Sequence, residues 1–398
     1  MNLLRPMWVT GTLAHGGAER HSITLMNRFA DRGHQCHAVY IKDTPLQNQL
    51  ARIDLRDGMT VRCMYARRFF DAESIATFAT HLTEIRPSVI VAANGYALMN
   101  ATLARIRSGL RIPIVATCHT TQLIGLKDQV KMLIDRPFYW RASCTVFVCA
   151  MQRQYWLRRG VASRCNTVIY NGVDTAHFVD TTTPAVRQAL RNSLGFADSD
   201  YVVGISAVLR PEKNHVQLLD AVAALRRQGI PARLLMIGDG PMREVIEARG
   251  RELGIEAAIR ISGFQQDVRQ SIALCDVMVL CSLSETFSLA ALESMAMGKP
   301  VIHSDVGGAK EMISAGHNGE LFALGASNAL VDCLAGLAQP GVAKAMGVNA
   351  RAVVEARFSE KAMVDRYESL LLDLCSRSLA SGEAVNVESP CRMNAPEH

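Results

Sequence analysis

The 398-residue chain lacks the features that mark membrane-spanning, secreted and zinc-binding proteins. No apolar run approaches the ~18 residues that a membrane-spanning helix requires. The apolar stretch before Gly11 is too short and too broken for a secretory signal. The eleven cysteines are scattered, and no C-x-x-C pair occurs, so the sequence indicates neither a disulfide framework nor a zinc site. These absences predict a protein of the reducing cytoplasm.

Two common nucleotide-binding loops are also missing. The chain has no Walker-type G-x-x-x-x-G-K-[ST] sequence and no spaced G-x-G-x-x-G fingerprint. Hydrophobic residues make up 49% of the chain and charged residues 20%, which is ordinary for a globular protein. Its length is too great for one typical core and suits two domains of roughly 150–200 residues each.

The net charge of +6 conceals a difference between the two halves. Residues 1–180 hold 22 basic and 12 acidic residues, a net charge of +10, and the remainder carries −4. Arginines stand beside aromatic residues in 67–70, 137–141 and 155–159. This pattern fits a solvated basic surface, or attraction to an anionic membrane face or a phosphate-bearing acceptor. Nucleic acid is not expected as a partner, because no recognised binding module appears.

Short apolar runs alternate with amphipathic segments, which predicts parallel sheets built from βαβ units. Strands are expected at 6–11, 35–41, 59–65, 87–93, 112–118, 144–149 and 166–170, and then at 201–208, 232–238, 258–263, 276–281 and 300–304. Two doubly wound domains, 1–180 and 181–358, would then face a cleft, with ligands at the carboxyl ends of the strands. The polar segment 376–398 is expected to be disordered.

Three candidate site segments follow predicted strands. Gly16 and Gly17 precede a helix, where the backbone can approach an anion, although such a pair is equally often a tight turn. Arg210 and Lys213 supply two cations that could neutralise a diphosphate, or they belong to a solvated turn around a proline. His119 could donate a hydrogen bond or move a proton, but a lone histidine is more often structural.

The segment from Glu285 to Glu293 is the most informative one. A buried strand is expected to end at Cys281, and a helix to start near Thr286 or Phe287 with Ser284 as its cap. Free amides at Phe287, Ser288 and Leu289 would favour a phosphate. If both glutamates were helical, they would lie about 12 Å apart along the axis. That exceeds the ~5–9.5 Å between the carboxylates of glycoside hydrolases, so the spacing favours two contacts on one long ligand over an acid/base pair. The alternative is structural, with Glu285 as a helix cap and Glu293 facing solvent.

Taken in order, these motifs resemble the retaining family-4 glycosyltransferases of the GT-B fold, which have two tandem Rossmann-like domains. The resemblance covers roughly residues 8–375. It rests on the segments Gly-Gly-Ala-Glu-Arg at 16–20, Asn-Gly-Val-Asp at 171–174, Pro-Glu-Lys-Asn at 211–214, Glu285 to Glu293 with Met-Gly-Lys-Pro-Val-Ile after it, and Gly-Gly-Ala-Lys-Glu at 307–311.

The resemblance implies a nucleotide-sugar donor in the second domain and a glycan or lipid-linked acceptor in the first. By similarity, Glu285 would touch the donor sugar, Glu293 the ribose, and His119 the transferred sugar. Diphosphate contacts would come from Lys213 and the amides of Ser288 and Leu289, with Gly17 approaching from the opposite domain. Backbone near Phe264 would meet the base. The family works without a divalent metal or other cofactor, and a helix at 359–375 would pack back on the first domain.

Two positions depart from the family pattern. Val208 stands where an arginine often helps to bind the diphosphate, and Arg210 is the candidate to replace it. Ser288 replaces a common glycine. Glu311 and Gly308 match the family pattern and are interpreted as structural residues of a tight turn and a cap.

The leading prediction is an enzyme of cell-surface polysaccharide or glycolipid synthesis that transfers a hexose or an N-acetylhexosamine. It would work in the cytoplasm, including the inner face of the membrane. A non-catalytic nucleotide-sugar-binding protein and a nucleotide-sugar epimerase are the alternatives.

Overall fold

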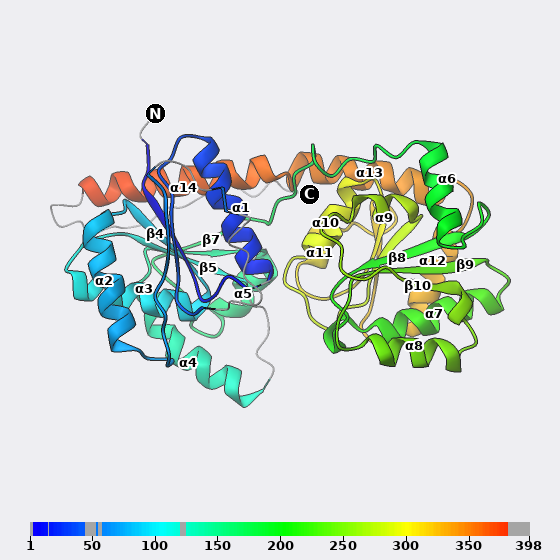
Figure 1. The fold of residues 1–398 in the computed structure, drawn as a ribbon, viewed down its shortest axis with the longest axis horizontal. Helices are drawn as coiled ribbons and strands as arrows, with labels where there is room; N and C mark the ends of the chain where they lie inside the picture. Colours follow the sequence, from blue (N-terminus) through cyan, green and yellow to red (C-terminus); the bar gives the residue numbers. More distant parts are fainter. Residues whose placement is uncertain (1–2, 15, 44–52, 55–57, 120–124, 381–398) are drawn as a thin grey trace.

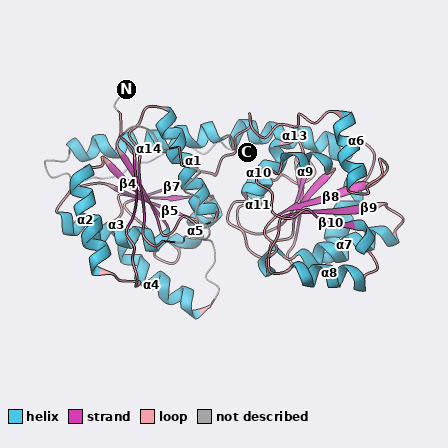
Figure 2. Ribbon diagram, viewed as in Figure 1, coloured by secondary structure: helices cyan, strands magenta, loops and turns pink. Residues whose placement is uncertain are grey.

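The computed structural model describes residues 3–14, 16–43, 53–54, 58–119 and 125–380. Two separate parallel sheets lie side by side, each with helices on both faces, as Figure 1 and Figure 2 show. The predicted α/β class is confirmed. The chain completes the first sheet before it begins the second, and then returns to the first along the helix α14.

The first sheet has seven strands in the order β3-β2-β1-β4-β5-β6-β7, and all its pairs are parallel. Its strands are β1 Pro6–Thr10, β2 His37–Tyr40, β3 Thr60–Cys63, β4 Val89–Ala93, β5 Ile114–Cys118, β6 Cys144–Phe147 and β7 Cys165–Val168. Its helices are α1 Gly17–Asp31, α2 Ala72–Ile85, α3 Asn94–Ser108, α4 Leu126–Arg141 and α5 Ala150–Leu157.

The second sheet has six parallel strands in the order β10-β9-β8-β11-β12-β13. Its strands are β8 Tyr201–Ser206, β9 Ala232–Ile237, β10 Ile259–Ile261, β11 Val277–Leu280, β12 Val301–Ser304 and β13 Gly319–Phe322. The helices are α6 Pro184–Ser193, α7 His215–Arg227, α8 Arg243–Glu252, α9 Arg269–Leu274, α10 Leu289–Ala296, α11 Ala309–Met312, α12 Ser327–Leu337, α13 Val342–Arg357 and α14 Glu360–Ala380, with short 3₁₀ turns η2 Pro211–Lys213 and η3 Glu256–Ala258.

The strand order reverses once in each sheet, between β1 and β4 and between β8 and β11. Ligands of open α/β sheets bind at such reversals, beyond the carboxyl ends of the strands. The central strands are mostly apolar and are buried on both faces. Near-continuous apolar runs of this kind are typical of parallel strands that helices cover on both sides. The loops after β1, β8 and β11 are therefore the first places to look for a site.

Every predicted strand exists within a few residues of its expected range, but β13 was not predicted. Its sequence, Gly-Glu-Leu-Phe, is short, and only its two end residues are buried. Helix α14 runs to Ala380, five residues beyond its predicted end at 375 and into the segment expected to be disordered. The rest of that segment, 381–398, lies outside the described residues.

Helix α14 covers the first sheet although it follows the second domain (Figure 1). Tyr367 and Leu371 are fully buried there, in one core cluster with Trp8 and Phe29. Arg32, at the end of α1, forms ion pairs with α14. The linker and the start of α14 meet at a bridge between Val173 and Ser359, so both crossings between the domains pass through one place.

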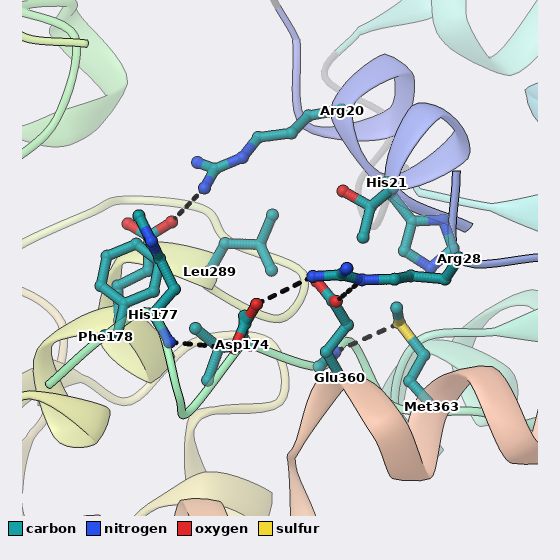
Figure 3. Close-up of a pocket in the computed structure, with 13 residues that line it drawn as sticks. Arg20, His21, Arg28, Asp174, His177, Phe178, Leu289, Glu360 and Met363 are labelled. Atoms are coloured by element: carbon teal, nitrogen blue, oxygen red, sulfur yellow. Dashed lines mark hydrogen bonds and ion pairs between the residues drawn. The ribbon is translucent and has the colours of Figure 1, made fainter. Parts of the chain in front are cut away.

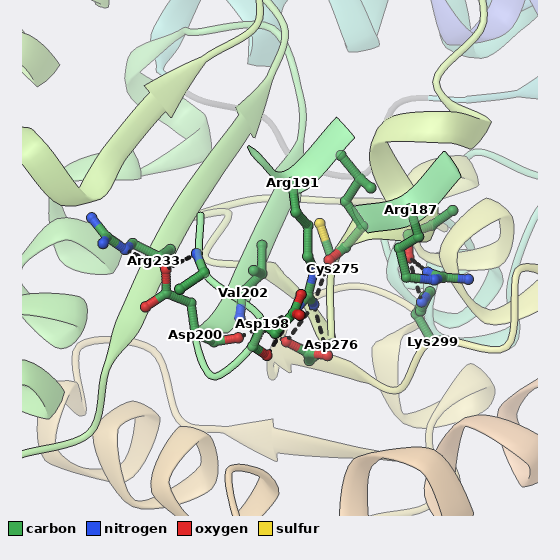
Figure 4. A network of polar contacts seen from close by, with 12 residues as sticks. Arg187, Arg191, Asp198, Asp200, Val202, Arg233, Cys275, Asp276 and Lys299 are labelled. Carbon is green, nitrogen blue, oxygen red and sulfur yellow. Dashed lines mark hydrogen bonds and ion pairs between the residues drawn. The ribbon is translucent and has the colours of Figure 1, made fainter. Parts of the chain in front are cut away.

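A buried arginine anchors the second domain just after the linker (Figure 4). Arg191 of α6 reaches the Asp276 carboxylate at 3.1 Å and the Leu274 carbonyl at 2.9 Å, while Asp276 also accepts the amide of Val202 at 2.7 Å. A buried charge is tolerated when it is paired and hydrogen-bonded in this way. The network holds α6 to the amino ends of β8 and β11, away from the cleft.

Leu371→Ala tests whether the first domain depends on α14. Removing a fully buried leucine costs about 2–5 kcal/mol, and we expect this loss in the unfolding of the first domain. All three tryptophans lie in that domain, so urea unfolding followed by tryptophan fluorescence reports on it. Ile106→Ala, at an exposed isoleucine of the same domain, should change stability by less than about 0.5 kcal/mol. Equal effects of the two variants would contradict the packing role.

A charged site between the two domains

Helix α10 begins later than the sequence predicted. Its cap is Ser288, whose hydroxyl accepts the amide of Ala291 at 3.3 Å, and not Ser284. Ser288, which stands where the family commonly has glycine, thus has a structural role as the cap of α10. Because the first turn of a helix lacks intrahelical acceptors, the amides of Leu289 and Ala290 have no carbonyl partner within α10. Glu285 consequently lies in the turn before the helix, and the 12 Å spacing of two helical glutamates does not apply.

Glu285 is held by a cation from the loop after β8. Lys213, at the end of η2, forms an ion pair with Glu285 Oε1, and the same oxygen accepts the Ser282 hydroxyl at 3.2 Å. Gly307, in the left-handed region with φ of 59°, lies directly beside this turn. A Cβ there would stand 2.1 Å from the Glu285 carbonyl oxygen, so only glycine allows the approach.

Glu293 is buried, at 5% exposure, and its carboxylate meets an arginine of the other domain. Arg20 Nη2 lies 2.6 Å from Glu293 Oε1. Burial raises the pKa of Glu293, and the attraction of Arg20 opposes this rise. The sequence separation of 273 residues kept this pair from being predicted.

Arg20 and Glu293 line a pocket of about 280 Å³ between the domains (Figure 3), whereas Glu285 and Lys213 are not among its lining residues. Arg20, His21 and Arg28 come from α1, and Leu289 and Glu293 come from α10. The linker and the start of α14 complete the wall with Gly172, Val173, Asp174, His177, Phe178, Glu360 and Met363. The pocket thus brings together residues that only the fold makes neighbours.

Ion pairs fix one wall of the pocket. Arg28 Nη2 lies 2.8 Å from an Asp174 oxygen, and Arg28 also forms an ion pair with Glu360. Sequence reasoning missed Arg20, Arg28, Asp174 and His177 as site residues. Arg20 and Asp174 stand within the motifs at 16–20 and 171–174, so a sequence signal was present, but their partners could not be inferred from it.

His119 lies at the end of β5, next to the second domain. Its carbonyl accepts the Thr286 hydroxyl at 3.0 Å, and its ring stands edge-on to His21 with centroids 4.7 Å apart. Burial lowers the pKa of His119 to about 4, so its imidazole is neutral at pH 7. A neutral ring can donate or accept a hydrogen bond, but it cannot serve as a cation there.

The remaining candidates have different surroundings. Gly17 begins α1 with open space where a Cβ would be, and Phe264 follows β10 as an exposed side chain. Arg210 is mostly exposed and reaches Glu212 at 4.0 Å rather than Glu285. Phe287 is a core residue that packs on Tyr170, so only its backbone can face a ligand. Of the predicted site residues, Leu289 and Glu293 line the pocket. The others do not: Gly17, His119, Arg210, Lys213, Phe264, Glu285, Phe287 and Ser288.

Glu311 of α11 caps a helix of the other domain. Its two carboxylate oxygens accept the amides of Ala150 and Met151, at 2.8 and 2.9 Å, at the start of α5. A carboxylate at a helix start satisfies free amides and is favoured by the helix dipole. Glu311 thus has a structural role, and the helix whose amides it binds lies across the domain boundary.

No metal-binding group stands out in the described part of the chain. Within it, no three or more His, Cys, Asp or Glu side chains are grouped to hold an ion. The charges of the site are instead supplied by arginine, lysine and glutamate. Independence from metal remains a prediction.

Comparisons with known proteins agree with this architecture. The family model described as Glycosyltransferase Family 4 matches residues 15–177, and the model described as Glycosyl transferases group 1 matches residues 186–353. The crystal structure of Anabaena Alr3699/HepE in complex with UDP and glucose superposes with a TM-score of 0.81 at 23% identity, over 93% of this chain and 100% of that one. The two sheets facing one site are therefore a GT-B fold, as predicted.

Sequence relatives complete the assignment. The N-acetyl-α-D-glucosaminyl L-malate synthase of Bacillus anthracis is 31% identical over 372 residues, 90% of this chain and 94% of that protein. The lipopolysaccharide 1,6-galactosyltransferase of Escherichia coli K12 is 26% identical over 67% of this chain and 68% of that protein. Several other relatives match over only 51–57% of their own length. The chain belongs to family 4 of the glycosyltransferases, and it is a glycosyltransferase.

Glu293→Gln tests the cost of the buried carboxylate. Because burial raises the pKa of Glu293, its ionised form is disfavoured in the folded protein, and stability is lost as pH rises from the unfolded pKa through the folded one. At pH 7 the variant should gain about 0.5–2 kcal/mol. This gain should vanish below about pH 4, where both states are neutral.

Urea unfolding at pH 7 and at low pH measures both effects. Glu252→Gln, at an exposed glutamate, is the control, and we expect it to change stability by less than about 0.5 kcal/mol. A loss of stability in Glu293→Gln at pH 7 would mean that the bond to Arg20 outweighs the burial of the charge.

Proposed function

We propose that this glycosyltransferase transfers a sugar from a nucleoside-diphosphate sugar to an acceptor hydroxyl, with retention of anomeric configuration. The sugar would be a hexose or an N-acetylhexosamine, and the acceptor a glycan or lipid-linked precursor of cell-surface polysaccharide or glycolipid. The observation that carries the proposal is the placement of Glu285 with Lys213 and of Glu293 with Arg20 around the start of α10.

The site has a contact for each part of such a donor. Glu293 can accept hydrogen bonds from ribose hydroxyls at the pocket. Lys213, which is paired with Glu285, and the amides of Leu289 and Ala290 at the start of α10 can hold the diphosphate. Glu285 then faces the sugar. The Anabaena protein was solved with UDP and glucose, and the Escherichia coli relative acts on lipopolysaccharide, which supports a nucleotide-sugar donor and a cell-surface product.

The chemistry we infer uses the leaving group as the base. The bond between the anomeric carbon and the phosphate oxygen breaks, and the acceptor oxygen attacks the same face and gives its proton to that phosphate oxygen. Glu285 stabilises the positive charge that develops on the sugar. His119, neutral at pH 7, contributes a hydrogen bond to the sugar and no charge.

Metal independence is part of this proposal. Lys213, Arg20 and the start of α10 supply positive charge and free amides beside the site, which is the role that a divalent ion plays in many phosphoryl-binding sites. Transfer should therefore keep its rate, within about twofold, in excess EDTA, measured as release of nucleoside diphosphate. Loss of transfer in EDTA and its recovery with added Mg²⁺ or Mn²⁺ would contradict this.

Glu285→Gln tests the assigned catalytic carboxylate. We expect transfer to fall by about 10²–10³-fold or more, because a neutral amide cannot stabilise developing positive charge. Donor affinity should change little, as measured by thermal shift against a panel of nucleoside diphosphates and nucleotide-sugars. Glu212→Gln, in the neighbouring loop, is the control and should retain full transfer. Unimpaired transfer by Glu285→Gln would exclude the role.

One observation keeps a second function open. Val208 is exposed and carries no charge where family members often have an arginine. The loop after β8 therefore has one cation fewer to bind the diphosphate of the donor. A chain that binds nucleotide-sugars without turnover over a broad acceptor panel would be a binding protein. Epimerisation would be recognised as conversion of the donor without any acceptor.

A further inference from the structure

Helix α4 presents an apolar face away from the protein body. Leu126 is 76% exposed and Trp140 is 55% exposed, and Val130, Leu133 and Ile134 are exposed between them. The inner side of the same helix holds the buried residues Asp135 and Tyr139 and packs on α3. The helix lies at the lower edge of the first domain in Figure 1 and projects from it.

The exposed apolar residues share one side of the helix. With about 100° per residue, positions 126, 130, 133, 134 and 140 fall within a sector of about 120°. That sector is centred roughly opposite the positions 128, 132, 135 and 139. A helix on the surface of a globular protein normally turns its apolar side inward and its polar side outward. Here the outward side is apolar, which points to a partner surface.

The charges beside this face have one sign. Lys127 and Lys131 are exposed and border it on one flank, and Arg136 lies on the other. The exposed Arg141 falls within the sector, at the last residue of the helix. The two acidic residues of the helix, Asp128 and Asp135, fall on its inner half. Asp135 is buried, and its burial raises its pKa to about 6. A partner that fits this face must therefore have an apolar layer deep enough to take up its side chains, and negative charge beside that layer.

We propose that α4 docks this protein on an anionic lipid bilayer, lying in the interface with Leu126, Val130, Leu133 and Trp140 among the acyl chains. Leucine and tryptophan suit that depth, and flanking lysines and arginines attract anionic headgroups. A second copy of the chain fits less well, because Lys127, Lys131 and Arg141 would meet their own counterparts. Within the described ranges, no helix has the length and apolar character needed to cross a membrane.

The proposal does not rest on the donor chemistry. It gives a role to one of the three segments in which arginine stands beside aromatic residues, because residues 137–141 belong to α4 and lie outside the donor site. It also places the membrane at the domain that would bind the acceptor, because α4 follows His119 after residues 120–124 and Gly125.

Vesicle co-sedimentation of the full chain tests the proposal. We expect binding to vesicles of phosphatidylcholine with 30% phosphatidylglycerol, at least tenfold weaker binding to phosphatidylcholine alone, and weakening of the former in 0.5 M salt. Leu133→Asp, an exposed position, should lose binding by at least tenfold, and Lys131→Glu should lose most of the preference for the anionic lipid. Leu324→Asp, at an exposed leucine of the second domain, should bind as the unchanged protein does.

Tryptophan fluorescence gives an independent measure. Trp8 and Trp156 are buried, and Trp140 is exposed on the face, so vesicle binding should shift the emission of Trp140 to shorter wavelength. Brominated lipids should quench it. Trp140→Phe should abolish the shift and the quenching while most vesicle binding remains.

Three outcomes would overturn the proposal: no binding to anionic vesicles at low salt, unchanged binding by Leu133→Asp, or a dimer of the unchanged protein that Leu133→Asp dissociates. Nucleotide thermal shifts of each variant show that the fold and the second domain are intact. They also separate failure of membrane docking from failure of the proposed transfer.

Discussion

The carboxylate of Glu293, buried where the two domains meet, is the constraint around which the site is arranged. Taking a carboxylate out of water costs several kcal/mol unless a charged partner compensates. Among the described residues its one side-chain partner is Arg20, which belongs to the other domain and remains 44% exposed. The protein thus keeps a group that is costly to bury at the boundary between the domains. If the Glu293 carboxylate bonded to another partner instead, the ion pair that joins α1 to α10 would be lost.

A second tie between the domains is of a different kind. Glu311 binds backbone amides at the start of α5, and Asn171 donates to the Phe287 carbonyl at 3.0 Å. These bonds end on main-chain groups that no donor would replace. The linker and α14 cross at the bridge between Val173 and Ser359, close to them. The domains are therefore joined firmly around the crossing and by a replaceable ion pair at the pocket.

Much of this fold could be predicted because parallel strands buried on both faces are apolar throughout. The strand β13 was not predicted because Gly319 and Glu320 interrupt the apolar pattern of a buried strand, and Phe322 is its one large buried side chain. The start of α10 was placed early because Ser284 and Ser288 are both possible caps, and sequence alone does not choose between them. Glu285 with Lys213 could be anticipated, since both follow adjacent strands. The partners of Glu293 and Glu311 could not, because a contact across two domains leaves no local pattern.

The two departures from the family pattern differ in their physical meaning. Ser288 fits, because its hydroxyl caps α10 and leaves the amides before Ala291 available. Val208 carries no charge, and the Arg210 side chain reaches Glu212 at 4.0 Å. That Arg210 takes the place of the missing arginine remains a prediction. Among the described residues, Lys213 is paired with Glu285 and Arg20 with Glu293, and Arg28, which lines the same pocket as Arg20, is paired with Asp174 and Glu360. The site is thus close to neutral as it stands. Any ligand that separates Arg20 from Glu293 also loosens the contact between α1 and α10, whereas Lys213 and Glu285 both belong to the second domain.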